Sequence, residues 1–155
     1  MKLYSLAILL GLTSAINPSL TQTGVCLKSQ DWKSNLPNSY DNLGIMQLEG
    51  DEAVHKLYEQ PLKQPELVLA YHPQCPYCRN FEPEFKKAVK NLKGYKVDIV
   101  TINMSKINDL QNSKLAVEGY PTVRLYQEKG KFKEYQGQRN ADGLKAFLEE
   151  NGIKK

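Results

Sequence analysis

The sequence has 155 residues, of which 41% are hydrophobic and 25% charged, and a formal net charge of +4. This length allows one domain with a sizeable core and leaves too little chain for a second independent core. The lysines are interleaved with acidic residues and form no basic stripe, so nucleic acid is not an expected partner. No internal repeat or low-complexity tract indicates an array or a linker.

The N-terminal segment has the features of a secretory signal peptide. Lys2 precedes an apolar run from Leu3 to Leu12, and small residues follow up to Ala15. The run is shorter than the roughly 20 apolar residues that span a bilayer, which disfavours a membrane anchor. We expect residues 1–15 to be removed and the mature protein to have no membrane span.

A polar extension over residues 16–43 follows, rich in Ser, Asn, Gln and Thr and without a sustained hydrophobic period. We expect this extension to contribute little to the core. It contains Cys26, one of three cysteines, which either forms an intermolecular disulfide or is a free thiol.

The predicted domain covers residues 44–155 and alternates between strands and helices. Short apolar runs predict strands, and apolar residues at helical spacing predict helices. The expected strands lie at 45–48, 67–71, 97–102, 123–126 and 132–135. The expected helices lie at 50–58, from Pro76 to Gly94, at 105–117 and at 141–148, the last capped by Asn140. The early strand-helix-strand units imply parallel pairing and the final hairpin antiparallel pairing, so we expect an α/β fold with a mixed sheet and helices on both faces.

A Cys-x-x-Cys motif lies between a buried strand and a helix. Cys75 is expected where unpaired backbone amides and the helix dipole favour a thiolate. One helical turn places Cys78 within reach of Cys75, so a mixed disulfide can be resolved internally. Pro76 opens the helix without the loss of a hydrogen bond.

Two other interpretations of a Cys-x-x-Cys pair are a zinc half-site and a static disulfide. The other candidate zinc ligands are Cys26, His55 and His72, and they form no second close-spaced pair. The preceding strand, the following helix and the secretory leader favour redox chemistry over a structural disulfide.

Several motifs together resemble the thioredoxin superfamily, and in particular the catalytic domain of protein disulfide isomerases. These motifs are Cys75-Pro76-Tyr77-Cys78, Pro83 five residues later, Gly119-Tyr120-Pro121-Thr122, Lys133-Glu134-Tyr135, Gly137, Arg139 and Ala141-Asp142. The resemblance covers residues 45–153 and implies a thioredoxin fold.

The resemblance also implies roles for individual residues. It implies that Pro121 follows a cis peptide bond and faces the cysteine pair, and that Tyr120 presents backbone groups to an extended substrate. Pro76 and Tyr77, between the cysteines, are expected to contact the substrate. Arg139 is expected to approach the site and favour the thiolate of the resolving cysteine; without the resemblance it is a solvated loop charge.

The sequence departs from the family pattern at three places. Leu69 stands where the family usually buries a carboxylate that moves protons for the resolving cysteine, so water or His72 would have to substitute. Gln74 stands directly before the first cysteine, where the family commonly has a tryptophan. Pro76-Tyr77 replaces the isomerases' Gly-His, which implies a less oxidising centre because that imidazole is missing. His72 is otherwise a polar residue at the rim of the site.

The sequence therefore predicts a thiol–disulfide oxidoreductase that acts on cysteine-containing polypeptides with a separate redox partner, in the endoplasmic reticulum lumen or outside the cell. It predicts no metal and no organic cofactor. Two alternatives remain, a binding or assembly module with little turnover and a glutaredoxin-like reductase of glutathione mixed disulfides. Thr122-Val123 disfavours the latter, because glutaredoxins carry a glycine pair there.

The sequence also contains a glycosylation sequon, Asn103-Met104-Ser105.

Overall fold

The computed structural model describes residues 40, 43–107 and 114–155. The predicted signal peptide, Cys26 and nearly all of the extension lie outside these residues. The described elements are β1 (Met46–Leu48), α1 (Gly50–Val54), the π-helical turn η2 (His55–Glu59), β2 (Glu66–Tyr71), α2 (Pro76–Asn91), β3 (Asp98–Asn103), the 3-10 turn η3 (Met104–Lys106), β4 (Thr122–Glu128), β5 (Lys131–Glu134) and α3 (Ala141–Glu150).

The five strands form one mixed sheet in the order β1-β3-β2-β4-β5. β3 pairs in parallel with both β1 and β2, whereas β4 pairs antiparallel with β2 and with β5. β2 is therefore a central strand, and all six of its residues are buried. This confirms the predicted mixed sheet and the continuous apolar run of its central strand.

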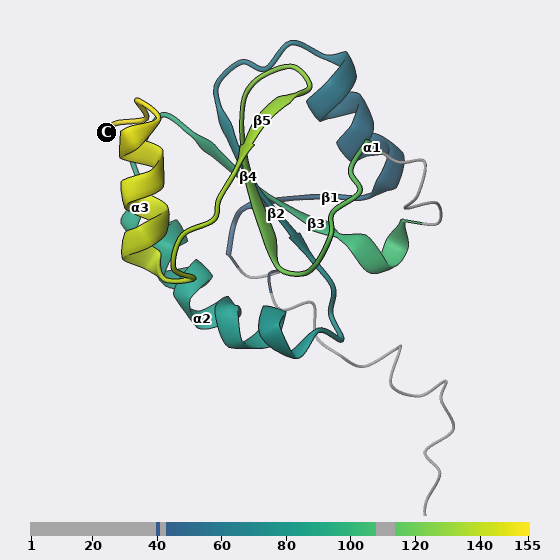
Figure 1. The fold of residues 1–155 in the computed structure, drawn as a ribbon. Helices are drawn as coiled ribbons and strands as arrows, with labels where there is room; N and C mark the ends of the chain where they lie inside the picture. The colour runs from purple at the N-terminus through teal and green to yellow at the C-terminus, as the bar shows by residue number, and fades with distance from the viewer. Residues whose placement is uncertain (1–39, 41–42, 108–113) are drawn as a thin grey trace, which may run out of the picture. The chain divides into compact units, whose positions relative to one another are not determined.

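Helices cover both faces of the sheet, as expected (Figure 1). Successive side chains of β2 point to opposite faces, so Leu67, Leu69 and Tyr71 pack with α2 and α3, and Val68 and Ala70 pack with α1 and η2. We call these the α2 face and the α1 face. α2 and α3 lie side by side, and the Ala141 amide of α3 donates to the Glu84 Oε2 atom of α2 at 2.9 Å.

Local sequence explains where the helices begin and end. Pro76 occupies the first turn of α2, where a missing N–H is tolerated, and Gly94 beyond its end has a φ of 89°, a conformation that favours glycine. Asn140 caps α3 through a 2.7 Å hydrogen bond that its side chain accepts from the Gly143 amide, which confirms the predicted cap.

The helix predicted over residues 105–117 is not formed in the part of that segment that the structure describes. Residues 104–106 form only η3, in which the Asn103 side chain accepts a hydrogen bond from the Ser105 amide at 3.1 Å. Residues 114–117 are not helical, and 108–113 lie outside the described residues. The Asn103 cap competes with continued α-helix at this point because it satisfies the backbone locally.

Tyr40 is the one described residue of the predicted extension, apart from Leu43, and it belongs to the core. Its side chain is 1% exposed on the α2 face, with its ring centroid 4.5 Å from that of Tyr71 and 5.8 Å from that of Phe85. The expectation that the extension adds little to the core is therefore wrong for Tyr40.

Candidate active site at the start of helix α2

The two cysteines lie at the junction that the sequence predicts. β2 ends at Tyr71, and Cys75 is the N-cap of α2 with extended backbone angles. The Cys75 amide donates to the His72 carbonyl at 3.0 Å, and the Cys78 and Arg79 amides donate to the Cys75 carbonyl at 3.1 and 3.2 Å. These bonds fix the turn between the strand and the helix, so Cys75 is held at the positive end of the helix dipole.

The two thiols have different environments. Both are free; Cys75 is half-buried, whereas Cys78 is 3% exposed. Burial is the main cause that raises the pKa of Cys78 to about 12; the neighbouring Cys75 sulfur acts in the same direction, and the His72 backbone and the Arg139 charge act in the opposite direction. At neutral pH Cys78 therefore holds its proton, and Cys75 is the accessible sulfur.

The segment before β4 lies against Cys75. The Tyr120–Pro121 peptide bond is cis, as the resemblance implied, and Pro121 is buried. The Cys75 thiol donates to the Tyr120 carbonyl at 3.5 Å, which joins residues 45 positions apart. The Tyr120 ring lies 5.7 Å, between centroids, from the His72 ring. This arrangement brings Cys75, Tyr120 and Pro121 together at one end of the sheet.

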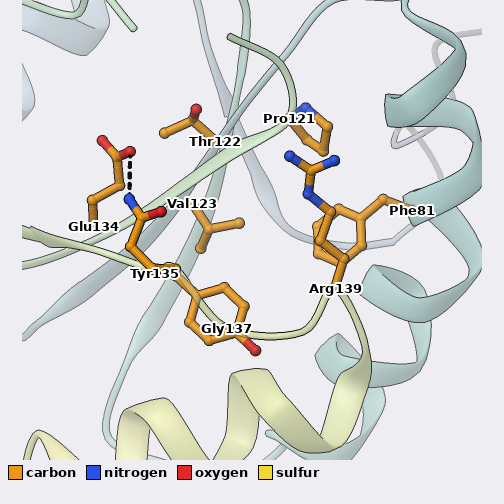
Figure 2. Close-up of a pocket in the computed structure, with 9 residues that line it drawn as sticks. Phe81, Pro121, Thr122, Val123, Glu134, Tyr135, Gly137 and Arg139 are labelled. Atoms are coloured by element: carbon orange, nitrogen blue, oxygen red, sulfur yellow. Dashed lines mark hydrogen bonds between the residues drawn. The ribbon is translucent and has the colours of Figure 1, made fainter. Parts of the chain in front are cut away.

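Arg139 lines a pocket of about 140 Å³ next to Pro121. Figure 2 shows its guanidinium group directed toward Pro121, beside Phe81 of α2. The Arg139 loop is held by Tyr135, whose hydroxyl donates to the Gln138 carbonyl at 2.5 Å. Gly137 allows this close packing, because a Cβ there would lie 2.6 Å from the Tyr135 ring. Arg139 is itself exposed, so water screens its charge.

The remaining candidate residues divide between the site and the surface. Tyr77 is 66% exposed and Pro76 is also exposed, so both lie at the accessible rim beside Cys75. The His72 ring accepts a 3.3 Å hydrogen bond at Nδ1 from the Gln74 amide, which holds it at the rim. His55 is exposed in η2 and contacts Glu59 at 2.8 Å.

Leu69 is fully buried in the same apolar cluster as Cys78. Within residues 40, 43–107 and 114–155, no group of three or more His, Cys, Asp or Glu side chains is arranged to hold a metal ion. The described helices also include none that is long and apolar enough to cross a membrane.

A scan against protein-family models matches the thioredoxin family over residues 48–150. The chain belongs to this family. The match includes β2, the cysteine pair, Pro121 and α3, and the five-stranded sheet with its helices is a thioredoxin fold.

Curated members of the family that are similar to this chain are protein disulfide-isomerases. That of Zea mays is 32% identical over 96 residues, 58% of this chain and 18% of its own length. That of Saccharomyces cerevisiae is 30% identical over 129 residues, 81% of this chain and 23% of its own length. The chain thus spans about a fifth of the length of these relatives.

Solved thioredoxin domains have the same fold. The J-Trx1 fragment of ERdj5 matches with a TM-score of 0.63 at 24% identity, over 73% of this chain and 54% of the fragment. The first thioredoxin domain of mouse protein disulfide-isomerase A4 matches with a TM-score of 0.56 at 25% identity, over 70% and 75% respectively.

Sequence reasoning missed one residue near the pair in this thioredoxin domain. The phenol of Tyr40 lies close enough to Cys78 for a thiolate charge there to act on it. Tyr40 stands in a polar stretch without periodicity, 31 positions before the first residue with which it stacks, so no local signal marks it.

Proposed function

We propose that the protein is a thiol–disulfide oxidoreductase that acts on polypeptide disulfides, with Cys75 as the attacking and Cys78 as the resolving thiol. One observation carries the proposal. An accessible cysteine caps α2 beside the Tyr120 carbonyl, and a second, buried cysteine lies one helical turn away. Membership of the thioredoxin family and similarity to protein disulfide-isomerases support it.

The first step uses the position of Cys75. Cys75 lies at the N-terminus of α2, the positive end of the helix dipole, and its thiolate attacks one sulfur of a substrate disulfide. A bond forms between Cys75 and that sulfur, the substrate S–S bond breaks, and the other substrate sulfur leaves with the electron pair and takes a proton. Electrons pass between sulfurs only, so the reaction needs no metal or organic cofactor.

The second step uses Cys78. Its thiol gives up a proton, and its sulfur attacks Cys75 in the mixed disulfide, which forms the Cys75–Cys78 bond and releases the reduced substrate thiol. Burial keeps Cys78 protonated until this step, so it does not compete with Cys75 for external disulfides. Run in reverse, the same steps oxidise a substrate dithiol.

The backbone before Pro121 is the proposed docking site for the substrate chain. Its carbonyl at Tyr120 already accepts a hydrogen bond from Cys75, so an extended peptide paired here would bring its own sulfur to the attacking thiol. Exposed Tyr77, two residues after Cys75, offers an additional apolar surface. Arg139, directed toward Pro121, is proposed to favour negative charge on Cys78.

The predicted leader over residues 1–15 supports a location in the endoplasmic reticulum lumen or outside the cell, where a separate redox partner would regenerate the pair. The isomerases' histidine between the two cysteines is absent here. Its absence favours a reduction potential of the Cys75/Cys78 pair more negative than the roughly −180 mV of a protein disulfide isomerase.

The decisive measurement is the glutathione redox equilibrium of the Cys75/Cys78 pair, with insulin reduction assayed beside it. We expect a reversible two-electron couple, and we expect Cys75→Ser to lower insulin reduction to the uncatalysed rate. Cys78→Ser should accumulate a mixed disulfide at Cys75. Cys26→Ser is the matched control, because it removes the third cysteine and leaves the pair intact.

A pair that does not cycle, or insulin reduction that persists in Cys75→Ser, would contradict this function. That result would favour a binding or assembly module. The observation that supports this second candidate is Leu69, which is fully buried in the cluster that contains Cys78. A leucine there cannot move protons for the resolving cysteine, as the carboxylate that the family usually buries at this position does.

A further inference from the structure

The Tyr40 hydroxyl is a buried polar group in the core of the α2 face. The side chain is 1% exposed, and the hydroxyl has no hydrogen-bond partner among the residues that the structure describes. Its ring packs at a tilt against Tyr71 and edge-on against Phe85, with centroid distances of 4.5 and 5.8 Å. An unpaired buried hydroxyl destabilises the folded state, so its presence calls for an explanation in another state of the molecule.

That other state is the one in which Cys78 carries negative charge. Tyr40 and Cys78 belong to the same apolar cluster, and charge on Cys78 acts on the Tyr40 phenol. In an apolar environment an isolated thiolate is strongly disfavoured unless a donor reaches it. A phenol O–H held nearby is such a donor.

The other groups that face Cys78 leave a need for a further donor. The His72 backbone favours the Cys78 thiolate but does not offset burial, which keeps the pKa of Cys78 raised, and the Cys75 sulfur is the atom that Cys78 must attack. Arg139 acts across the exposed rim of the site, where water weakens its effect. From the sheet, Leu69 presents only carbon atoms.

The groups that face Tyr40 keep it protonated. Burial, Cys78, Glu82 of α2 and Tyr71 all raise the pKa of its phenol. Glu82 forms an ion pair with Lys86 at 2.5 Å and is 21% exposed, so its charge lies toward solvent. A phenol that stays neutral throughout the working pH range can donate its proton in a hydrogen bond but does not give it away.

We propose that the Tyr40 hydroxyl donates a hydrogen bond to the Cys78 sulfur as that sulfur becomes a thiolate, and thereby accelerates resolution of the mixed disulfide. The inference rests on the proposed oxidoreductase function. The Cys78 proton passes to solvent, the Cys78–Cys75 bond forms, the bond from Cys75 to the substrate breaks, and the substrate sulfur leaves with the electron pair and is protonated. Tyr40 keeps its own proton from start to finish.

The test separates attack from resolution in one reaction. The full chain, carrying Cys26→Ser, is mixed in its dithiol form with 5,5′-dithiobis(2-nitrobenzoate). Attack by Cys75 releases one coloured thiolate, and resolution by Cys78 releases a second. In Tyr40→Phe we expect the second phase to slow roughly tenfold, the factor expected on loss of one hydrogen bond to a charged group. The first phase should be unchanged.

A second measurement follows the Cys78 thiolate directly. In Cys75→Ser, the pH profile of Cys78 alkylation by iodoacetamide, quantified on the Cys78 peptide, should move to higher pH when Tyr40→Phe is added. Tyr126→Phe is the matched control, because Tyr126 is also 1% exposed and packs in the cluster on the opposite face of the sheet. It should change neither the second phase nor the profile.

An unchanged second phase in Tyr40→Phe would overturn the inference, as would a loss of both phases together, which would indicate a structural role for Tyr40. Absence of the two phases in the unsubstituted Tyr40 protein would instead contradict the oxidoreductase function itself.

Discussion

Each face of the sheet buries one tyrosine to 1% exposure, and the two differ in what their hydroxyls contact. On the α1 face, the Tyr126 hydroxyl lies 3.2 Å from that of Tyr58, which in turn donates to the Lys114 carbonyl at 2.7 Å. On the α2 face, the Tyr40 hydroxyl has no partner among the described residues. The Tyr126 hydroxyl is therefore paired within the fold, whereas the Tyr40 hydroxyl lies in the cluster that contains Cys78, the cysteine that must change its charge.

The same contrast holds for buried charge. Glu66 begins β2, is 2% exposed and forms a 2.7 Å ion pair with Lys56 of η2 on the α1 face. Cys78 on the α2 face is a comparably buried ionisable group, and the groups that act on its charge are the Cys75 thiol, the His72 backbone and the exposed Arg139. A permanent pair suits a structural charge. A charge that exists only during a reaction is better matched by neutral donors.

The largest expected effect comes from removing the aromatic packing beneath Tyr40. Phe85 is fully buried and contacts both Tyr40 and Phe81, so Phe85→Ala should lower the free energy of unfolding by about 3–5 kcal/mol. It should also slow resolution by Cys78, because the Tyr40 ring loses its support. Urea denaturation and the two-phase thiol release measure these effects.

The matched variant on the other face is Leu57→Ala, also at a fully buried position, with an expected loss of about 2–5 kcal/mol. Under conditions in which both variants remain folded, Leu57→Ala should leave the thiol kinetics unchanged. If it slows resolution as much as Phe85→Ala does, the division between a structural and a reactive face is wrong.

The ion pair of Glu66 gives an effect of intermediate size. Lys56→Met leaves the carboxylate buried without its partner and should cost about 1–3 kcal/mol at pH 7, less than for a fully enclosed pair because the Lys56 side chain is 25% exposed. Burial already raises the pKa of Glu66. The folded state thus binds a proton more readily than the unfolded state, and the stability contribution of Glu66 falls as the pH rises through its folded pKa.

The destabilisation by Lys56→Met should therefore shrink as the pH is lowered toward 4, since protonation removes the unpaired charge. Urea denaturation at a series of pH values measures this dependence. Glu66→Gln is the control and should lack it. A penalty for Lys56→Met that is constant from pH 4 to 7 would mean that the pair contributes through packing alone.

The parts of the α2 face were unequally predictable from the sequence. The apolar run of β2, the stripe of α2 and the position of Cys75 between them follow from periodicity and helix-end signals, and the structure confirms them. The cis bond before Pro121 was predictable only from the family resemblance, because nothing local distinguishes it from an ordinary proline at a strand start. Tyr40 was not predictable, since a single aromatic residue in a polar stretch reaches the core only through tertiary contacts.

The smallest effect is the most direct comparison of the two tyrosines. Tyr126→Phe removes a hydrogen bond to Tyr58 and should destabilise the protein by about 0.5–1.5 kcal/mol. Tyr40→Phe removes a hydroxyl that has no partner among the described residues and keeps the stacked ring, so it should be neutral or slightly stabilising. Urea denaturation of the dithiol forms, side by side, measures both. A loss in Tyr40→Phe equal to that in Tyr126→Phe would show that the Tyr40 hydroxyl is already bonded in the resting protein, and it could then not be held in reserve for the Cys78 thiolate.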